Sequence, residues 1–308
     1  MRIAFLGTPA FAVPALSALQ GAGHELAAVV AQPDRPAGRG QELRVPATKA
    51  WAREHGCPVL QPEKVRDGRL ASELAALAPD LLVVVAYGRI LGKDLLELAP
   101  QGAVNVHASL LPRYRGAAPI QWAIATGDAE TGVSVMQMDE GLDTGDVLLQ
   151  RVAPIGDDDA ETLARRLSLL GGEALVEALA LLEASRITPV RQDSALATLA
   201  PILKKEDGRL DFHLPAVRLA ARIRAFRPWP GAFTTFASRT LKVHRAVAGG
   251  EAGLAPGAAR AEAEGLRVGC GERTSLLLLE VQQEGRKRVP ATDFVKGQPV
   301  PDGTLLGT

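Results

Sequence analysis

Short, continuous apolar runs alternate with amphipathic stretches over the first two-thirds of the chain. Residues 2–6, 26–31 and 81–86 are almost wholly apolar, which is typical of strands covered on both faces in a parallel sheet. Helical patterns at residues 13–20, 47–54 and 69–77 lie between them, with glycine, proline or aspartate at the joints. This β-α-β-α order predicts an open α/β sheet.

The same part of the chain continues with a strand expected at residues 103–107, a helix at 118–125 and strands at 132–138 and 147–153. A long helix is expected from the three aspartates at 157–159 to about residue 184, because acidic residues favour the first helical turn. Residues 185–206 lose this periodicity and contain Thr188-Pro189 and Ala200-Pro201. We interpret them as an interdomain connection.

The last third has a different pattern. One helix is expected at about 215–225, followed by strand-like runs at 232–236, 240–247, 266–269 and 276–281 that glycine clusters separate. Several short strands in so short a stretch predict a small β-barrel or sandwich.

Composition supports two domains and shows a hidden charge asymmetry. The chain has 308 residues, 47% of them hydrophobic, and a formal net charge of zero, so two packed cores are possible. Residues 1–203 contain 18 Lys and Arg against 24 Asp and Glu, whereas residues 204–308 contain 17 against 11. Either this division is a chance fluctuation, or one domain performs chemistry while the other binds a polyanion.

Several classes of protein are excluded at this stage. Cys57 and Cys270 are far apart and belong to no CxxC motif, so a disulfide scaffold and a cysteine-built zinc site are ruled out. Gly7, Pro9 and Pro14 interrupt the first apolar stretch, and no apolar run reaches 18 residues, so a cytoplasmic protein with no membrane segment is expected. Neither a GxGxxG nor a GxxxxGK[ST] motif is present, so dinucleotide and P-loop chemistry lack support.

Asn105 and His107 form the first candidate site. They end a predicted strand of the parallel sheet, where ligands bind in open α/β folds. Their i, i+2 spacing places both side chains on one face of the strand. An amide donor beside an imidazole can stabilise an oxyanion that develops on a carbonyl. The alternative is that both side chains only satisfy backbone groups at the strand end.

An acidic turn at residues 138–146 is the second candidate. For Asp139 and Glu140 an ordinary glycine-rich turn is the preferred interpretation. The spacing of its carboxylates does not complete a calcium loop, so no metal site is predicted. One carboxylate of this turn could orient His107, but spacing alone does not choose which.

Residues 32–44 are the third candidate. They contain three arginines among prolines and glycines without a core-forming period. A solvated loop is the simplest interpretation, but arginines on a glycine-hinged loop also suit phosphate or base contacts.

Seven segments together resemble the methionyl-tRNA formyltransferase family. They are FLGTP at 5–9, QPDRPAGRG at 32–40, VVVAYG at 83–88, NVHASLLP at 105–112, RGAAPI at 115–120, GLDTGD at 141–146 and IRAFRPWP at 223–230. The resemblance implies an open, mostly parallel Rossmann-like sheet of the formyltransferase fold and a C-terminal oligonucleotide-binding-type β-barrel. It implies a catalytic domain at 1–188, a linker at 189–206 and a tRNA-binding barrel at 207–308.

The resemblance also implies an activity and its partners. A formyl group would pass from 10-formyltetrahydrofolate, without a metal, to the α-amino group of methionyl-initiator tRNA, in a cytoplasmic monomer. The implied catalytic set is Asn105, His107 and Asp143. The implied folate-lining residues are Ser109, Leu110, Leu111, Pro112, Val85, Ala86, Tyr87 and Gly88. The implied tRNA-binding residues are Arg35, Arg39, Arg44, Lys204, Lys205, Arg218, Arg222, Arg224 and Arg227.

Two alternatives remain at the level of sequence. A folate-dependent formyltransferase for a small amine, such as an amino sugar or glycinamide ribonucleotide, would share the first domain but would have no need for a basic second part. A catalytically silent RNA-binding protein on the same scaffold would have no need for Asn105, His107 and Asp143.

Overall fold

The computed structural model describes residues 1–37 and 42–307, so Arg39 lies outside the described residues. The chain splits into two compact units. Unit 1 contains Met1–Pro119, Glu130–Pro154 and Ala164–Pro201, and unit 2 contains Ile120–Ala129, Ile155–Leu163 and Ile202–Thr308. No helix in the described ranges combines the length and the apolar character needed to cross a membrane.

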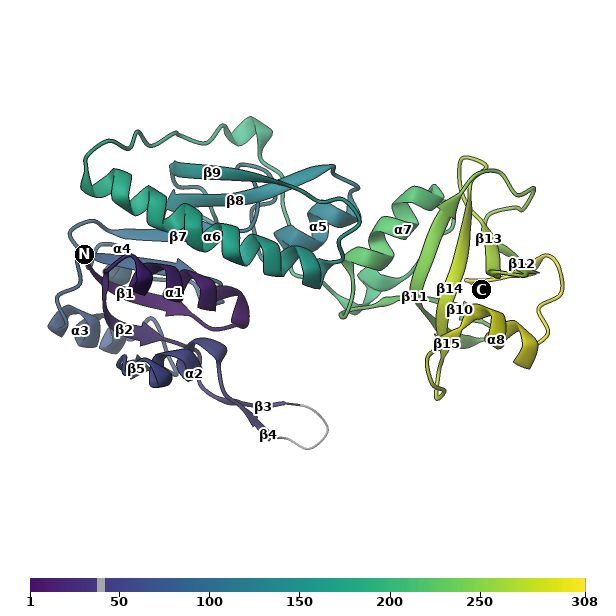
Figure 1. Ribbon diagram of the computed structural model, residues 1–308, viewed down its shortest axis with the longest axis horizontal. Coiled ribbons are helices and arrows are strands. Elements are labelled where there is room, and N and C mark those ends of the chain that lie inside the picture. Colours follow the sequence, from purple (N-terminus) through teal and green to yellow (C-terminus); the bar gives the residue numbers. More distant parts are fainter. Residues whose placement is uncertain (38–41, 308) are drawn as a thin grey trace. The chain divides into compact units, whose positions relative to one another are not determined.

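Unit 1 is built on a seven-stranded sheet with the order β5-β2-β1-β6-β7-β8-β9 (Figure 1). Its strands are β1 (Arg2–Gly7), β2 (Glu25–Val30), β5 (Val59–Leu60), β6 (Leu81–Val85), β7 (Ala103–His107), β8 (Glu130–Gln137) and β9 (Val147–Pro154). The pairs from β5 to β7 are parallel, and β7, β8 and β9 pair antiparallel. The expected open, mostly parallel sheet is confirmed. Its strands contain continuous apolar runs because they are covered on both faces.

Helices cover this sheet, as the amphipathic patterns predict. They are α1 (Val13–Gly21) with the short turn η1 (Ala10–Ala12) before it, α2 (Ala47–Glu54), α3 (Arg69–Ala76), α4 (Lys93–Leu96) and α6 (Ala160–Glu183). One core joins Leu70 and Leu74 of α3 and Leu95 of α4 to Leu6 and Val84 of the strands.

The long helix α6 packs closely on β7 and on α1, and two glycines make this approach possible. A Cβ atom on Gly171 would lie 2.9 Å from Val106 Cγ1, and one on Gly172 would lie 3.0 Å from the Pro14 carbonyl oxygen. Both contacts are tighter than side chains normally allow.

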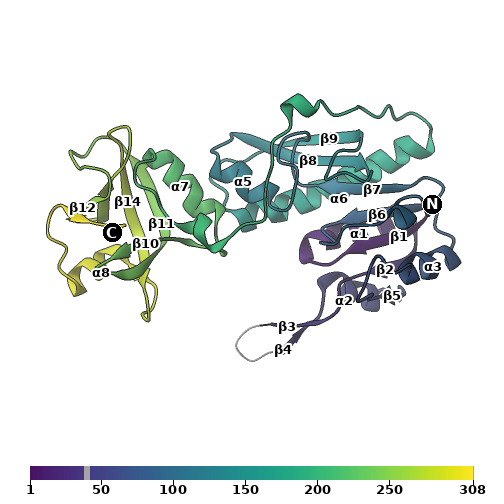
Figure 2. The same cartoon turned by 180° about the vertical axis from the view of Figure 1, so that it is seen from behind.

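The arginine-bearing segment, expected as a loop, is partly a hairpin. Strands β3 (Arg35–Ala37) and β4 (Glu42–Arg44) pair antiparallel, and Arg35 lies opposite Arg44. The hairpin projects from the body of unit 1 (Figures 1 and 2). Beside its base, Lys49 Nζ lies 2.8 Å from both carboxylate oxygens of Asp34, and Gln61 Nε2 donates to the same carboxylate at 2.7 Å.

Unit 2 is an antiparallel sheet with the order β10-β11-β14-β13-β12-β16, and β15 pairs with β14. Its strands are β10 (Ala232–Phe236), β11 (Arg239–Gly249), β12 (Ala258–Glu262), β13 (Gly265–Gly269), β14 (Ser275–Gln283), β15 (Val289–Pro290) and β16 (Thr304–Leu305). Gly307, just after β16, donates to the Thr235 carbonyl of β10 at 3.0 Å. The two ends of the strand order therefore meet, and the expected small β-barrel is confirmed.

The barrel core is closed by α7 (Ala216–Ala225) and α8 (Ala291–Gly297), of which only α7 was expected. Leu219 and Ile223 of α7 are buried among the strands, and Phe294 of α8 packs edge-on against Phe236 with ring centroids 5.3 Å apart. The remaining elements of the chain are α5 (Pro119–Ala125), η2 (Ser194–Leu196) and η3 (Lys205–Gly208).

Two segments that precede residue 164 group with unit 2, although the sequence places them in the first domain. The contacts give the reason. Trp122 of α5 packs edge-on against Phe226 with ring centroids 6.0 Å apart, and Arg224 donates to the Gly156 carbonyl at 2.7 Å. Such long-range contacts are not visible in local periodicity.

Candidate active site

The candidate site lies where two neighbouring parallel strands end. Val84 of β6 pairs with Asn105 of β7, and the strands end at Val85 and His107. The segments that follow them therefore leave the sheet at the same edge, which is the usual ligand position in an open α/β sheet.

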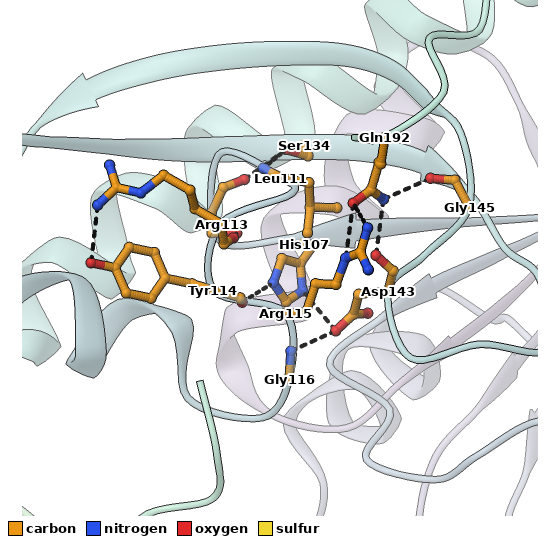
Figure 3. A network of polar contacts seen from close by, with 11 residues as sticks. His107, Leu111, Arg113, Tyr114, Arg115, Gly116, Ser134, Asp143, Gly145 and Gln192 are labelled. Carbon is orange, nitrogen blue, oxygen red and sulfur yellow. Dashed lines mark hydrogen bonds and ion pairs between the residues drawn. The ribbon is translucent and has the colours of Figure 1, made fainter. Parts of the chain in front are cut away.

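His107 is buried, and both of its ring nitrogens face protein oxygens (Figure 3). Nε2 lies 2.9 Å from the Tyr114 carbonyl oxygen. Since a carbonyl only accepts, this nitrogen carries a hydrogen. Nδ1 lies 3.7 Å from Asp143 Oδ2, which is longer than a hydrogen bond. Nδ1 is therefore the nitrogen that remains able to act on a substrate.

Asp143 reaches His107 only because its loop folds back along the sheet. Gln137, the last residue of β8, pairs with Val104 near the start of β7. His107 is about 10 Å further along that strand, at roughly 3.3 Å per residue. Asp143 has a left-handed backbone with φ of 53°, and its Oδ2 accepts a 2.8 Å hydrogen bond from the Gly116 N–H. The carboxylate that spacing alone could not identify is thus Asp143.

Asp139 stabilises the interior of this loop. Its Oδ1 accepts hydrogen bonds from the Gly141 N–H at 3.0 Å and from Thr144 Oγ1 at 2.6 Å. The interpretation of Asp139 as a turn residue agrees with these contacts.

Asn105 is half-buried, two residues before His107 on the same face of β7. Within residues 1–37 and 42–307, its amide has no hydrogen-bond partner. An amide group that is not already bonded can donate to a developing oxyanion.

Side chains of β8 and β9 hold the segment from Ser109 to Pro112 by hydrogen bonds. Ser134 Oγ donates to the Ser109 carbonyl at 2.6 Å and accepts from the Leu111 N–H at 3.1 Å. Gln150 Nε2 donates to the Leu111 carbonyl at 2.9 Å. Sequence analysis missed Ser134, although a lone hydroxyl in the apolar run of residues 132–138 is a usable signal.

The other expected folate segment offers mainly backbone. Tyr87 is a core residue, and burial raises the pKa of its hydroxyl. Val85 is buried too, whereas Ala86 and Gly88 are exposed and have positive φ angles of 49° and 75°. A ligand at this edge would meet the backbone of Ala86 and Gly88 and not the Tyr87 ring.

Two further polar residues near Asp143 were also missed. Gln192 and Arg115 are both buried, and Arg115 Nε and Nη2 donate to Gln192 Oε1 at 3.0 and 2.8 Å. Gln192 Nε2 donates to the carbonyls of Asp143 and Gly145 at 2.9 and 2.7 Å (Figure 3). No periodic pattern around Gln192 could have indicated this position.

The expected tRNA-binding residues fall into two groups. One group is exposed and consists of Arg35, Arg44, Lys204, Lys205 and Arg218. The other has partners inside unit 2: Arg222 donates to the Asp207 carbonyl at 2.8 Å, Arg224 to the Gly156 carbonyl, and Arg227 lies 3.6 Å from Asp159 Oδ2. Arg39 lies outside the described residues.

Metal ligands are not gathered anywhere in the described ranges, where no group of three His, Cys, Asp or Glu side chains is placed to hold an ion.

Comparison with known proteins gives the family. Residues 1–179 match the family described as "Formyl transferase", and residues 202–299 match "Formyl transferase, C-terminal domain". The methionyl-tRNA formyltransferase of Anaeromyxobacter sp. (strain K) is 68% identical over 303 residues, which cover 96% of this chain and 97% of that protein. The chain belongs to the methionyl-tRNA formyltransferase family.

More distant members agree. The methionyl-tRNA formyltransferase of Geobacter sulfurreducens is 50% identical and covers all of this chain and 97% of its own length. Among solved structures, the sugar 3N-formyl transferase WlaRD aligns with a TM-score of 0.68 at 15% identity, over 93% of this chain and 99% of that one. This structural likeness shows the formyltransferase fold, and the close sequence relatives show the family within it.

Proposed function

We propose that the chain transfers a formyl group from 10-formyltetrahydrofolate to the α-amino group of methionyl-initiator tRNA. The observation that carries the proposed chemistry is the His107 imidazole held between the Tyr114 carbonyl and the Asp143 carboxylate. Beside it lies the Asn105 amide, which has no hydrogen-bond partner among the residues that the structure describes. Full-length relatives named for this activity support the choice of substrate.

The reaction needs a donor for a developing oxyanion. An α-amine with a pKa near 8 is partly neutral at pH 7 to 8, and its nitrogen attacks the formyl carbon. The carbonyl oxygen becomes an oxyanion, to which the Asn105 amide and a protonated His107 Nδ1 would donate. One such oriented donor is typically worth about 3 kcal/mol of transition-state stabilisation.

The reaction also needs a path for one proton. The new C–N bond forms at the amine, the bond between the formyl carbon and N10 of the folate breaks, and the amine proton ends on N10. His107, which is protonated on Nδ1 while it donates to the oxyanion, would give that proton to N10 and take the amine proton in its place, since Nε2 is bonded to the Tyr114 carbonyl. Asp143 would orient the imidazole and balance its charge.

Substrate binding is divided between the two parts of the chain in this proposal. Residues 1–188 carry the chemistry, residues 189–206 connect, and residues 207–308 bind tRNA. The folate would lie against Ser109, Leu110, Leu111 and Pro112 and the backbone of Val85, Ala86, Tyr87 and Gly88. Arg35 and Arg44 support an anion-binding role for the hairpin, because like charges placed opposite each other repel unless an anion lies between them.

Of the expected tRNA-binding residues in or beside the second part, Lys204, Lys205 and Arg218 are exposed, and they are the best candidates for phosphate contacts. Arg222, Arg224 and Arg227 would contribute mainly by holding unit 2 together. A function in translation implies that the protein acts in the cytoplasm, as a monomer in this proposal.

The test is incubation with the formyl donor and methionine-charged initiator or elongator tRNA, with formylated product measured for each. Initiator tRNA is expected to be formylated much faster. Equal rates, or product only with a small amine such as an amino sugar, would contradict the proposed substrate.

A further inference from the structure

Residues 190–200, which we name the strap, run past the candidate active site and form hydrogen bonds with two of its segments, the Arg115 segment and the Asp143 loop. At one end, Val190 exchanges two 2.8 Å backbone hydrogen bonds with Val147, where β9 begins. At the other end, the backbone N–H of Arg115 donates to the Thr198 carbonyl at 2.8 Å, and the Arg115 carbonyl accepts from the Ala200 N–H at 2.7 Å. The segment that looks like a linker in sequence is thus part of unit 1.

The approach of the strap is close enough to require glycine at residue 116. Gly116 has φ of 121°, and a Cβ atom there would lie 2.7 Å from the Ala200 carbonyl oxygen. Gly116 is also the backbone donor to the Asp143 carboxylate. One side of the strap therefore fixes the donor that holds Asp143.

Gln192 connects the middle of the strap to the Asp143 loop, and its orientation is determined by its partners. Oε1 accepts both hydrogen bonds from Arg115, so the amide nitrogen must face the other way. That nitrogen donates both of its hydrogens, one to the Asp143 carbonyl and one to the Gly145 carbonyl. Every polar atom of this buried side chain is used.

The Asp143 loop needs such a clamp for a physical reason. It folds back from the end of β8, and Asp143 adopts a left-handed backbone, which residues other than glycine adopt only rarely. A strained segment persists only where its surroundings determine it. The two carbonyls held by Gln192 belong to Asp143 itself and to a residue two positions later.

We propose that Gln192 is a positioning residue, which holds the Asp143 loop folded back so that its carboxylate faces His107. Arg115 acts one step further away by fixing the orientation of the Gln192 amide. This inference rests on the proposed function of Asp143, because a misplaced carboxylate matters only if the carboxylate takes part in the reaction.

The test is a double-mutant cycle in the full-length protein with Gln192→Ala and Asp143→Ala. We expect Gln192→Ala to lower kcat about tenfold or more, with KM for both substrates changed by less than about threefold. In the Asp143→Ala background the same substitution should change kcat by less than about twofold, because the group it positions is already gone. A merely structural role would lower kcat by the same factor in both backgrounds, and that result would overturn the inference.

A nearly isosteric variant keeps the test valid if Gln192→Ala folds poorly. Gln192→Glu retains an acceptor for Arg115 and gains an ion pair, so it should lower the thermal unfolding temperature less than Gln192→Ala does. It presents a carboxylate oxygen to the Asp143 and Gly145 carbonyls, which repel it, so kcat should still fall about tenfold or more. Wild-type kcat in Gln192→Glu would overturn the inference.

Gln283→Ala is the matched control. Gln283 is 3% exposed, close to the 9% of Gln192, and its amide bonds to Gln298 within unit 2. Its loss should lower stability without lowering kcat. If Asp143→Ala alone retained wild-type kcat, the proposed function of Asp143 would fail, whereas an inactive Asp143→Ala with an unaffected Gln192→Ala would reject only the role of Gln192.

Discussion

The Oδ2 atom of Asp143 faces His107 Nδ1 at 3.7 Å and accepts a 2.8 Å hydrogen bond from the Gly116 N–H. One oxygen therefore connects the imidazole to the backbone of a neighbouring segment. The negative charge is held in place by a neutral donor, so it remains available to a protonated His107. The Asp143 carboxylate therefore has two properties, its negative charge and its ability to accept the Gly116 hydrogen bond, and substitutions can test them separately.

Asp143→Asn keeps the shape and removes the charge. The amide oxygen can still accept from Gly116, so folding and KM for tRNA should change little. We expect kcat to fall about a hundredfold or more, because nothing then balances a positive imidazole. Steady-state kinetics checks this, and retention of a tenth of wild-type kcat would show that the charge is unnecessary.

A second prediction concerns the stability of unit 1 in acid. The hydrogen bonds from Lys49 and Gln61 hold the pKa of Asp34 below its ordinary value. A lowered folded-state pKa contributes stability that is fully present above the unfolded pKa, about 3.9, and is lost as the pH falls through the folded pKa. The Lys49 side chain is only 8% exposed, so its charge needs this partner.

The check is urea unfolding of the wild type and Asp34→Asn between about pH 3 and pH 6. The wild type should be more stable at the upper end, and the difference should shrink as the pH falls below about 4. Glu54→Gln, at an exposed position of α2, is the control. A difference that did not depend on pH would contradict the ionic role of Asp34.

The third prediction separates exposed from internally bonded cations of unit 2. Replacing Lys204 or Lys205 by Ala should weaken initiator and elongator tRNA alike and reduce the slope of log affinity against log salt by about one per lost phosphate contact. Arg222→Ala should instead lower the unfolding temperature with little change of slope, because Arg222 bonds to the Asp207 carbonyl and lies over the Phe226 ring at 5.0 Å. A larger change of slope for Arg222→Ala than for Lys204→Ala would reverse this assignment.

The fourth prediction concerns Arg39, which follows β3 and precedes β4 in the sequence. Arg39 lies between two glycines in sequence, and we expect it to recognise the acceptor end of initiator tRNA. Arg39→Ala should lower kcat/KM for initiator tRNA about tenfold or more and reduce its advantage over a tRNA with a paired first position. Equal losses on both tRNAs would show a nonspecific phosphate contact. Arg53→Ala, on the exposed face of α2, is the control.

Much of the sheet could be predicted from sequence because its strands are fully buried. Continuous apolar runs mark β1, β2 and β6 without any information from neighbours. By contrast, β5 has two residues and β12 contains Arg260 and Glu262, so neither shows a strand period. Their pairing depends on distant strands, which a local pattern does not reveal.

The same limit applied to the candidate site. Asn105 and His107 share a strand, so spacing alone indicated that they lie together, whereas choosing Asp143 needed the family resemblance. Gln192 lies in an aperiodic segment. Its importance depends on contacts with Gly145, Asp143 and Arg115, which are separated from it by 47, 49 and 77 positions in the chain. The Asp143 loop also folds back along the sheet toward His107, and a simple hairpin turn would not do so.

The most direct test of the proposed catalytic set is single-turnover formyl transfer with enzyme in excess, for the wild type, Asn105→Ala, His107→Ala and the double variant. This measurement isolates transfer from product release. Each single substitution should lower the rate about a hundredfold or more, and the double variant should lose far less than the product of the two effects, because the residues act on one transition state. A His107→Ala enzyme that kept a tenth or more of the wild-type rate would contradict the account.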